Sequence, residues 1–351
     1  MQSNINEGKG LILRFFTALR KAAPGAAVAG LMLVSQYASA EPPTLSLPVD
    51  CEIGRSCWLV NFVDHDPGPG ATDYRCGGLS YDTHKGTDIA IRNDAAMKNG
   101  VRVLAAAPGK VAGTRDGMGN STKADLESVA RLRGRDCGNG VRIEHADGWS
   151  TQYCHMMKGS IRVRTGDVVA RGQVLGTIGR SGRTEFPHIH LSLRQGERVI
   201  DPFTGDSNVA ACRTAADDAG SLWDPALKDA LAYPGPQPFN LGFASKPPKT
   251  AEIESGILAA TTFPAESAAL VFFAEAFSLK KDDILTLTLT APDGATVADH
   301  TITLDRPLAK GHWFTGRKRR GTGWETGLYT GTITITRDGV AVAKSATARV
   351  E

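Results

Sequence analysis

The sequence lacks several features that mark zinc-finger, membrane and helical metalloprotease proteins. No Cys-x-x-Cys pair occurs, which disfavours a cysteine-based zinc site. After residue 40, no apolar run approaches the roughly 20 residues that a membrane-spanning helix needs. The His-Glu-x-x-His motif of helical zinc proteases is also missing. The 39 glycines follow no three-residue period, so a collagen-like chain is excluded.

Residues 1–40 have the pattern of a removable secretion signal. A basic leader precedes the apolar run 22–34, and Ala38-Ser39-Ala40 has the small residues of a signal-peptidase site. The alternative is an uncleaved membrane anchor, but the run is short for a span and contains Pro24. We expect cleavage after Ala40, a periplasmic or secreted protein, and no stable membrane insertion afterwards.

The net charge belongs to this leader. The whole chain has 40 Lys and Arg against 37 Asp and Glu, a formal charge of +3. Residues 1–40 hold four of the basic residues and one of the acidic ones, which leaves 36 of each in the remainder. A bulk electrostatic argument for binding nucleic acid therefore fails, and we expect no nucleic-acid partner.

Cysteine use is consistent with export. All six cysteines lie between residues 51 and 212, and an exported chain with six can form up to three disulfides. Six cysteines allow about 15 full pairings, among which the sequence does not choose. Cys51 and Cys57 are close enough along the chain to form one local loop. The six are Cys51, Cys57, Cys76, Cys137, Cys154 and Cys212.

The pattern of short β-like runs predicts a mainly β protein with two domains. Runs separated by Gly-rich turns over 41–205 indicate a compact antiparallel, sheet- or barrel-like domain. Only 121–133 has a helical pattern, as an insertion. Residues 206–250 have the Pro-rich composition of a linker, and 251–351 have the strand spacing of a small immunoglobulin-like β-sandwich.

Two histidines two residues apart carry the first chemical signal. In a strand, His188 and His190 point to the same face, opposite to Ile189 and Leu191. Core packing does not explain two imidazoles on one polar face. If the segment from His84 is extended, His84 and Asp88 also share a face.

These residues form a ligand set that suits zinc. Catalytic Zn2+ usually keeps three protein ligands and one open position for water, and His84, Asp88 and His190 supply two imidazoles and a carboxylate. Zinc lowers the pKa of a bound water towards 7 and polarises a carbonyl. His155 and His188 are the candidates for moving protons near neutral pH. For His65 and His145, structural roles are expected instead.

With these residues the chain resembles the lysostaphin-type zinc endopeptidases, which cut peptidoglycan. The matching motifs occur in the family's order between residues 84 and 190. They are His84-x-x-x-Asp88, Gly138-Asn139-Gly140-Val141, Tyr153-Cys154-His155-Met156, Gly172-Gln173-x-Leu175-Gly176, Gly179-x-Ser181-Gly182 and His188-x-His190. The resemblance implies one zinc ion on His84, Asp88 and His190, with His155 and His188 assisting catalysis.

The implied function is hydrolysis of amide bonds in peptidoglycan stem peptides or cross-links by an exported zinc metalloendopeptidase. The rival is a non-enzymatic peptidoglycan-binding or amidase-activating protein on the same fold, which loss of the zinc ligands would mark. Glu185-Phe186-Pro187 replaces the Thr-Gly usual in the family before its His-x-His, and 116–137 is a long charged insertion.

The second domain has no assigned function or protein partner. Its basic run 316–321 suits a solvated hairpin or a contact with an anionic envelope polymer. Trp313 and Trp324 suit the core or a sugar-stacking surface.

Overall fold

The computed structural model describes residues 41–351 except 122–131, 208–219 and 259. The predicted signal segment and nearly all of the predicted helix over 121–133 therefore lie outside the described residues. Residues 40–351 form one compact unit. Within the described residues, no helix has the length and apolar character to cross a membrane.

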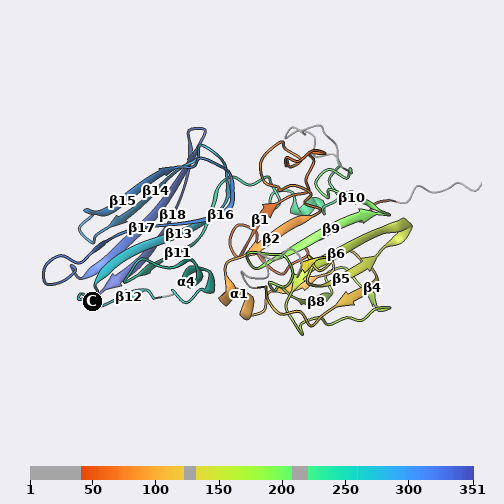
Figure 1. The fold of residues 1–351 in the computed structure, drawn as a ribbon, viewed down its shortest axis with the longest axis horizontal. Coiled ribbons are helices and arrows are strands. Elements are labelled where there is room, and N and C mark those ends of the chain that lie inside the picture. Colours follow the sequence, from red (N-terminus) through yellow and green to blue (C-terminus); the bar gives the residue numbers. More distant parts are fainter. Residues whose placement is uncertain (1–40, 122–131, 208–219, 259) are drawn as a thin grey trace, which may run out of the picture. The chain divides into compact units, whose positions relative to one another are not determined.

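The first region is built on an eight-stranded antiparallel sheet with the order β1-β2-β9-β6-β5-β4-β7, and β10 pairs with β9 (Figure 1). The strands are β1 (Cys57–Asn61), β2 (Thr87–Ile91), β4 (Gly109–Arg115), β5 (Asn139–Glu144), β6 (Trp149–Met156), β7 (Val168–Val169), β9 (His188–Gln195) and β10 (Arg198–Ile200). A two-stranded sheet joins β3 (Arg102–Leu104) to β8 (Val174–Thr177). The predicted antiparallel β domain is confirmed, as an open sheet and not a closed barrel among the described strands.

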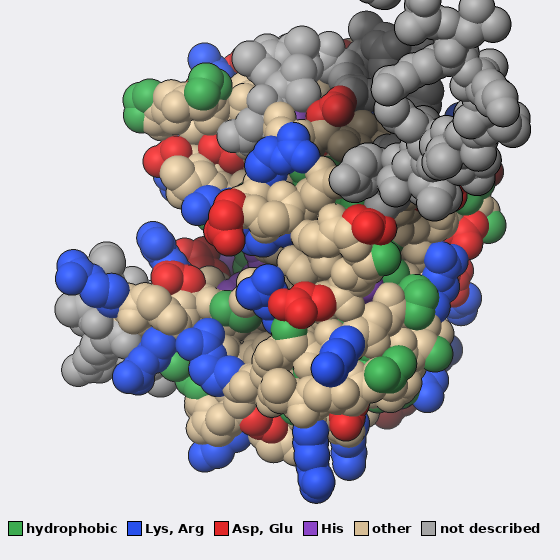
Figure 2. All heavy atoms as spheres, turned by 90° about the vertical axis from the view of Figure 1, so that its right-hand side faces the viewer, with side chains coloured by type: hydrophobic (Ala, Val, Ile, Leu, Met, Phe, Trp, Pro, Cys, Tyr) green, Lys and Arg blue, Asp and Glu red, His purple; other side chains and the backbone are tan. Residues whose placement is uncertain are grey.

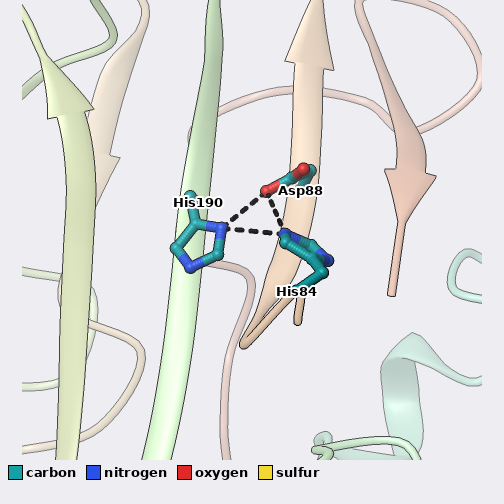
Figure 3. A group of neighbouring side chains, drawn as sticks. All are labelled: His84, Asp88 and His190. Atoms are coloured by element: carbon teal, nitrogen blue, oxygen red, sulfur yellow. Dashed lines mark hydrogen bonds and ion pairs between the residues drawn. The ribbon is translucent and has the colours of Figure 1, made fainter. Parts of the chain in front are cut away.

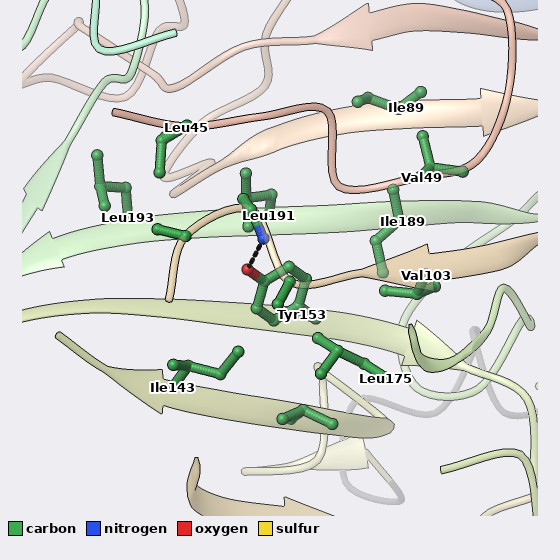
Figure 4. Packing of buried hydrophobic residues seen from close by; sticks show 14 of the residues in the cluster. Leu45, Val49, Ile89, Val103, Ile143, Tyr153, Leu175, Ile189, Leu191 and Leu193 are labelled. Carbon is green, nitrogen blue, oxygen red and sulfur yellow. Dashed lines mark hydrogen bonds between the residues drawn. The ribbon is translucent and has the colours of Figure 1, made fainter. Parts of the chain in front are cut away.

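One face of this sheet builds the core. Ile189, Leu191 and Leu193 of β9 are fully buried, as the alternation around the two histidines predicts. Figure 4 shows these side chains packed around Tyr153 of β6, whose hydroxyl accepts a hydrogen bond from the Ala106 amide at 2.7 Å. The odd-numbered β9 residues thus anchor the strand, and the even-numbered ones are left for the opposite face.

The second region is a β-sandwich. One sheet has the order β11 (Gln237–Ala244), β13 (Ala269–Leu279), β16 (Leu308–Lys318). The other contains β12 (Thr262–Phe263), β18 (Val340–Val350), β17 (Gly327–Arg337), β14 (Ile284–Thr290) and β15 (Thr296–Thr303). Leu270 and Phe272 of the first sheet pack with Leu287 and Ile333 of the second in one buried cluster. The alternation of apolar residues with Thr in β14 and β17 places the apolar face inward.

Several segments differ from expectation. Residues 206–250 were expected as linker, but β11 lies within them because Phe239 and Phe243 supply buried side chains to the sandwich sheet. The short helices α1 (Asp94–Lys98) and α4 (Thr250–Ser255) and the 3-10 turn η3 (Pro225–Leu227) were not expected. Each has six residues or fewer, so it is too short to leave a periodic apolar pattern in the sequence.

The cysteines that the structure describes are disulfide-bonded. Cys51 pairs with Cys57, which confirms the local loop, and Cys137 pairs with Cys154. Cys76 is also disulfide-bonded, whereas Cys212 lies outside the described residues.

Candidate metal centre and catalytic site

Three side chains meet on the face of the main sheet opposite the core (Figure 3). His84 Nε2 lies 3.0 Å from His190 Nδ1 and 3.2 Å from Asp88 Oδ1. His190 Nδ1 lies 2.8 Å from Asp88 Oδ1. Two imidazole nitrogens and one carboxylate oxygen therefore converge on one point from residues up to 106 positions apart.

Strand pairing and a close backbone approach set this geometry. Asp88 on β2 lies directly opposite His190 on β9 in the antiparallel register. His84 lies in the turn before β2, so its side chain reaches the three-residue centre from the segment that leads into that strand. A Cβ at Gly86 would stand 2.5 Å from the Leu191 carbonyl and 2.7 Å from His190 Nε2. Only glycine lets the turn pass this close to β9.

Each ligand candidate is held by a partner on its far side. His84 Nδ1 donates to the Phe62 carbonyl at 2.6 Å, which leaves Nε2 for the centre. The Asn61 amide donates to Asp88 Oδ2 at 2.9 Å, and His190 Nε2 lies 2.9 Å from the Ser192 hydroxyl. Such outer partners fix the tautomer and the ring orientation of metal-binding histidines.

The three atoms suit a small tetrahedral cation. In a zinc site with bonds of about 2.0–2.2 Å, two ligand atoms are about 3.3–3.6 Å apart. The separations of 2.8, 3.0 and 3.2 Å are slightly shorter, so a small outward movement of the side chains would seat the ion. With three ligands from the chain, one tetrahedral position stays open.

Burial and mutual charge shift the acid–base properties of this cluster. Burial lowers the pKa of His84, but the Asp88 carboxylate beside it, the Phe62 carbonyl and Asp64 together raise it above its ordinary value. Burial raises the pKa of Asp88, yet His84 and His188 beside it lower it well below the usual range. Burial lowers the pKa of His190, which keeps its ring neutral with a lone pair for a metal.

His155 and His188 lie beside the three converging side chains. Their ring centroids are 4.6 Å apart, and His188 Nε2 lies 3.5 Å from Asp88 Oδ1. His155 Nδ1 donates to the Ser181 carbonyl at 2.8 Å, while His188 Nδ1 lies 3.0 Å from the Phe186 carbonyl. Because these contacts use Nδ1, Nε2 of both rings is left available for proton transfer. Burial, followed by the neighbouring His188 and His190, lowers the pKa of His155 well below its ordinary value.

A left-handed backbone and a tight loop crossing place His155. Its φ of 65° is unusual for a non-glycine residue in a strand, and such strain gathers at functional sites. The loop that supplies the Ser181 carbonyl crosses Gly138, where a Cβ would stand 2.3 Å from that carbonyl. The two Gly-rich motifs seen in the sequence therefore build the support of His155.

All five predicted site residues lie in this one cluster, and other residues of it were not predicted. His65 and His145 lie apart from it: His65 Nε2 pairs with the buried Asp201 at 2.8 Å, which is a structural contact. His145 bridges the Pro108 carbonyl and the Thr151 hydroxyl. The unpredicted residues are Asn61, Phe62, Tyr81, Ser181, Thr184 and Ser192.

The cluster is largely closed off from solvent. His84, Asp88, His155 and His188 are all buried. Figure 2 shows only small areas of His side chain on the face it presents, between interspersed acidic and basic residues. Neither sign of charge dominates that face, in agreement with the balanced charge of the chain after residue 40.

Comparison with known proteins gives one family and several curated relatives. Residues 82–202 match Peptidase family M23. The chain is 38% identical over 64 residues to the cell division protein DipM of Caulobacter vibrioides, a match covering 18% of this chain and 10% of that protein. It is 36% identical over 73 residues to the peptidoglycan DD-endopeptidase ShyB of Vibrio cholerae, covering 21% and 17%. It is 33% identical over 87 residues to the DD-carboxypeptidase/endopeptidase Mpg of Neisseria meningitidis, covering 24% and 20%.

Among solved structures, the catalytic domain of the M23 protein EnpA from Enterococcus faecalis is 28% identical, with a TM-score of 0.27 over 39% of this chain and 82% of that chain. This score is too low to add to the assignment, which rests on the sequence match. The matched segment holds all five site residues, from His84 to His190. By sequence, residues 82–202 are therefore similar to Peptidase family M23.

Proposed function

We propose that the chain is an exported, zinc-dependent endopeptidase that hydrolyses amide bonds in the stem peptides or cross-links of peptidoglycan. The observation that carries the proposal is the convergence of His84, Asp88 and His190 with His155 and His188 beside them. The curated relatives include peptidoglycan DD-endopeptidases, which supports peptidoglycan as the substrate.

Each side chain has a task that follows from its contacts. A zinc ion on His84, Asp88 and His190 would supply an activated water and polarise the carbonyl of the scissile amide. Asn61 and Ser192 hold Asp88 and His190 in the orientation that this binding needs. The low pKa of His155 leaves its Nε2 free to accept a proton from the attacking water.

In this proposal, His188 stabilises the developing oxyanion and supplies a proton to the leaving amine. Its Nδ1 is held by the Phe186 carbonyl, and its Nε2 faces the Asp88 carboxylate at 3.5 Å. From this position the ring can donate a hydrogen bond to a developing oxyanion and pass a proton to the leaving amine. The two histidines thus divide the work of base and acid.

Export rests on the N-terminal sequence and on the disulfides. Residues 1–40 carry the signal pattern, and the Cys51–Cys57 and Cys137–Cys154 bridges suit an oxidising compartment. The non-enzymatic rival would be marked by loss of the zinc ligands, and the sequence keeps His84, Asp88 and His190.

The test is digestion of purified sacculi, with mass spectrometry of the released fragments and zinc analysis of the protein. We expect one zinc per chain and a new amine and carboxyl end at one stem-peptide or cross-link bond. Removing zinc with a chelator abolishes the cleavage, and adding zinc restores it. His190→Ala or Asp88→Ala lowers the rate by about 10³-fold or more, since several kcal/mol of stabilisation depend on the ion.

His145→Gln is the matched control, because His145 belongs to the same domain but contacts only Pro108 and Thr151 in the hydrogen bonds of its ring. It retains zinc and full activity. Full activity of a folded, zinc-free Asp88→Ala variant would overturn the proposal.

A further inference from the structure

A groove of about 850 Å³ lies in the β-sandwich, far along the sequence from the peptidase segment. It follows β16, which forms the edge of its three-stranded sheet, and reaches the neighbouring edge strand β15. Ser245 and Lys246 close one side. Its volume falls in the range of about 300–1,000 Å³ that is typical of ligand sites.

The charge of the groove has one dominant sign. Lys246, Arg317 and Lys318 line it, together with His300 and His312, against the single acidic residue Asp299. Lys246 is paired with Glu252 at 3.0 Å. Within the described part of the chain, Arg317 and Lys318 have no ion-pair partner and are exposed. The Arg317 guanidinium lies 5.9 Å from the centroid of the Trp324 ring, so its charge meets an aromatic face but no carboxylate of the described residues. The groove therefore offers an anionic ligand two cations that have no ion-pair partner among those residues.

Aromatic surface accompanies these cations. Phe314 is 42% exposed on β16, whereas its neighbour Trp313, which also lines the groove, is half-buried and packs against the sandwich core. Trp324, the other tryptophan considered from the sequence, is buried in the core and donates to the Ser267 carbonyl. An exposed ring next to unpaired cations suits a ligand that alternates sugar rings with carboxylates.

We propose that this groove binds the glycan–peptide strand of peptidoglycan and holds the enzyme on its polymeric substrate. Arg317 and Lys318 bind the carboxylates of stem peptides, and Phe314 and Trp313 pack against the sugar rings. This inference rests on the proposed function, and it assigns the second domain a binding site separate from the peptidase cluster.

The test uses the full chain with Arg317→Glu/Lys318→Glu and, separately, Phe314→Ala. Binding is measured by co-sedimentation with purified sacculi in a His190→Ala background, so that cleavage does not intervene. We expect the charge reversal to weaken binding roughly tenfold and the loss of the ring to weaken it several-fold. Amidation of the sacculus carboxylates weakens binding by the parent chain to a similar extent and does not weaken binding by the charge-reversed variant.

Lys281→Glu/Arg306→Glu is the matched control, since both residues are exposed on the sandwich outside the groove and the charge change is identical. It binds sacculi normally. In the active chain, the groove variants still cleave a soluble cross-linked muropeptide at the normal rate and digest sacculi more slowly. If the parent chain cleaves neither substrate, the proposed function fails. The co-sedimentation experiment still shows whether the groove binds peptidoglycan, because it does not depend on cleavage.

Two outcomes would overturn the groove proposal. One is equal sedimentation of the groove variants and the control. The other is parent binding that is as strong to DNA or to phosphatidylglycerol vesicles as to sacculi, with the same loss in the variants.

Discussion

Asp88 in the first region and Glu275 in the second are buried carboxylates, and one oxygen of each accepts a hydrogen bond from an asparagine side chain. The two residues differ in the groups that face the other oxygen. Asn61 donates to Asp88 Oδ2 at 2.9 Å, and Asn240 donates to Glu275 Oε2 at 2.6 Å. The second oxygen of Glu275 lies 3.0 Å from Lys310 Nζ. The second oxygen of Asp88 faces only imidazole nitrogens at ion-pair distance among the described residues.

This difference separates a structural charge from a chemical one. A buried anion needs a compensating cation, and Glu275 has a permanent one from its own chain. Asp88 has only groups whose charge depends on protons or on a bound metal. The buried Glu275 therefore has its counter-charge without a ligand, whereas the peptidase cluster gains its full charge balance from a cation.

The largest effect on stability is expected at the sandwich pair. Lys310→Ala leaves Glu275, which is fully buried, without its cation. We expect the free energy of unfolding to fall by about 3–5 kcal/mol, measured by urea denaturation. Zinc content and cleavage of a soluble muropeptide remain normal, because the pair serves structure alone.

The double variant Lys310→Met/Glu275→Gln controls for lost packing. Since neither position then carries a charge, it recovers much of the stability. A Lys310→Ala protein that is as stable as the parent would show that Glu275 needs no cation, and the comparison with Asp88 would break.

Much of the fold follows from local sequence patterns. The alternation of apolar residues with Thr over 284–290 predicts a strand, and β14 has those bounds. The turn at Asp147-Gly148 predicts the β5–β6 hairpin that forms. Strand β11 escapes prediction because the prolines in and around it suggest a linker. Its place comes from its buried phenylalanines and from pairing with β13, about 35 residues away along the chain.

The site residues likewise divide into those that local sequence spacing predicts and those that it does not. His84, Asp88 and His190 are visible because two-residue and four-residue spacings place side chains on one face of a strand. Asn61 and Ser181 carry no such spacing. Asn61 meets Asp88 through a register shift between Leu59 and Asn61, and Ser181 acts through its backbone carbonyl, which any residue has.

The next effect in size concerns the disulfides, which occur only in the first region because the sequence beyond residue 212 has no cysteine. Cys137–Cys154 closes a separation of 17 residues, and Cys154 lies opposite His190. Replacing both by Ala is expected to lower the free energy of unfolding by about 3 kcal/mol, from loop-closure entropy. Cleavage of the muropeptide also slows, because the Cys137 carbonyl accepts the His155 amide.

Cys51→Ala/Cys57→Ala is the comparison, with a separation of six residues and an expected loss of about 2 kcal/mol. Its activity stays normal, since neither cysteine contacts the cluster. Equal loss of activity in both double variants would mean that the bridges act on the fold as a whole.

The smallest effect returns to the two asparagines. Asn61→Ala frees the carboxylate of Asp88 to rotate, and we expect zinc affinity to fall about 10–100-fold in competition with a chromogenic chelator. Asn240→Ala removes the equivalent bond from Glu275, so it lowers stability and leaves zinc affinity unchanged. Asn61→Asp is destabilising for the metal-free cluster because it places a second carboxylate beside Asp88. If Asn61→Ala and Asn240→Ala change zinc affinity equally, then Asn61 supports the fold alone and does not orient a ligand.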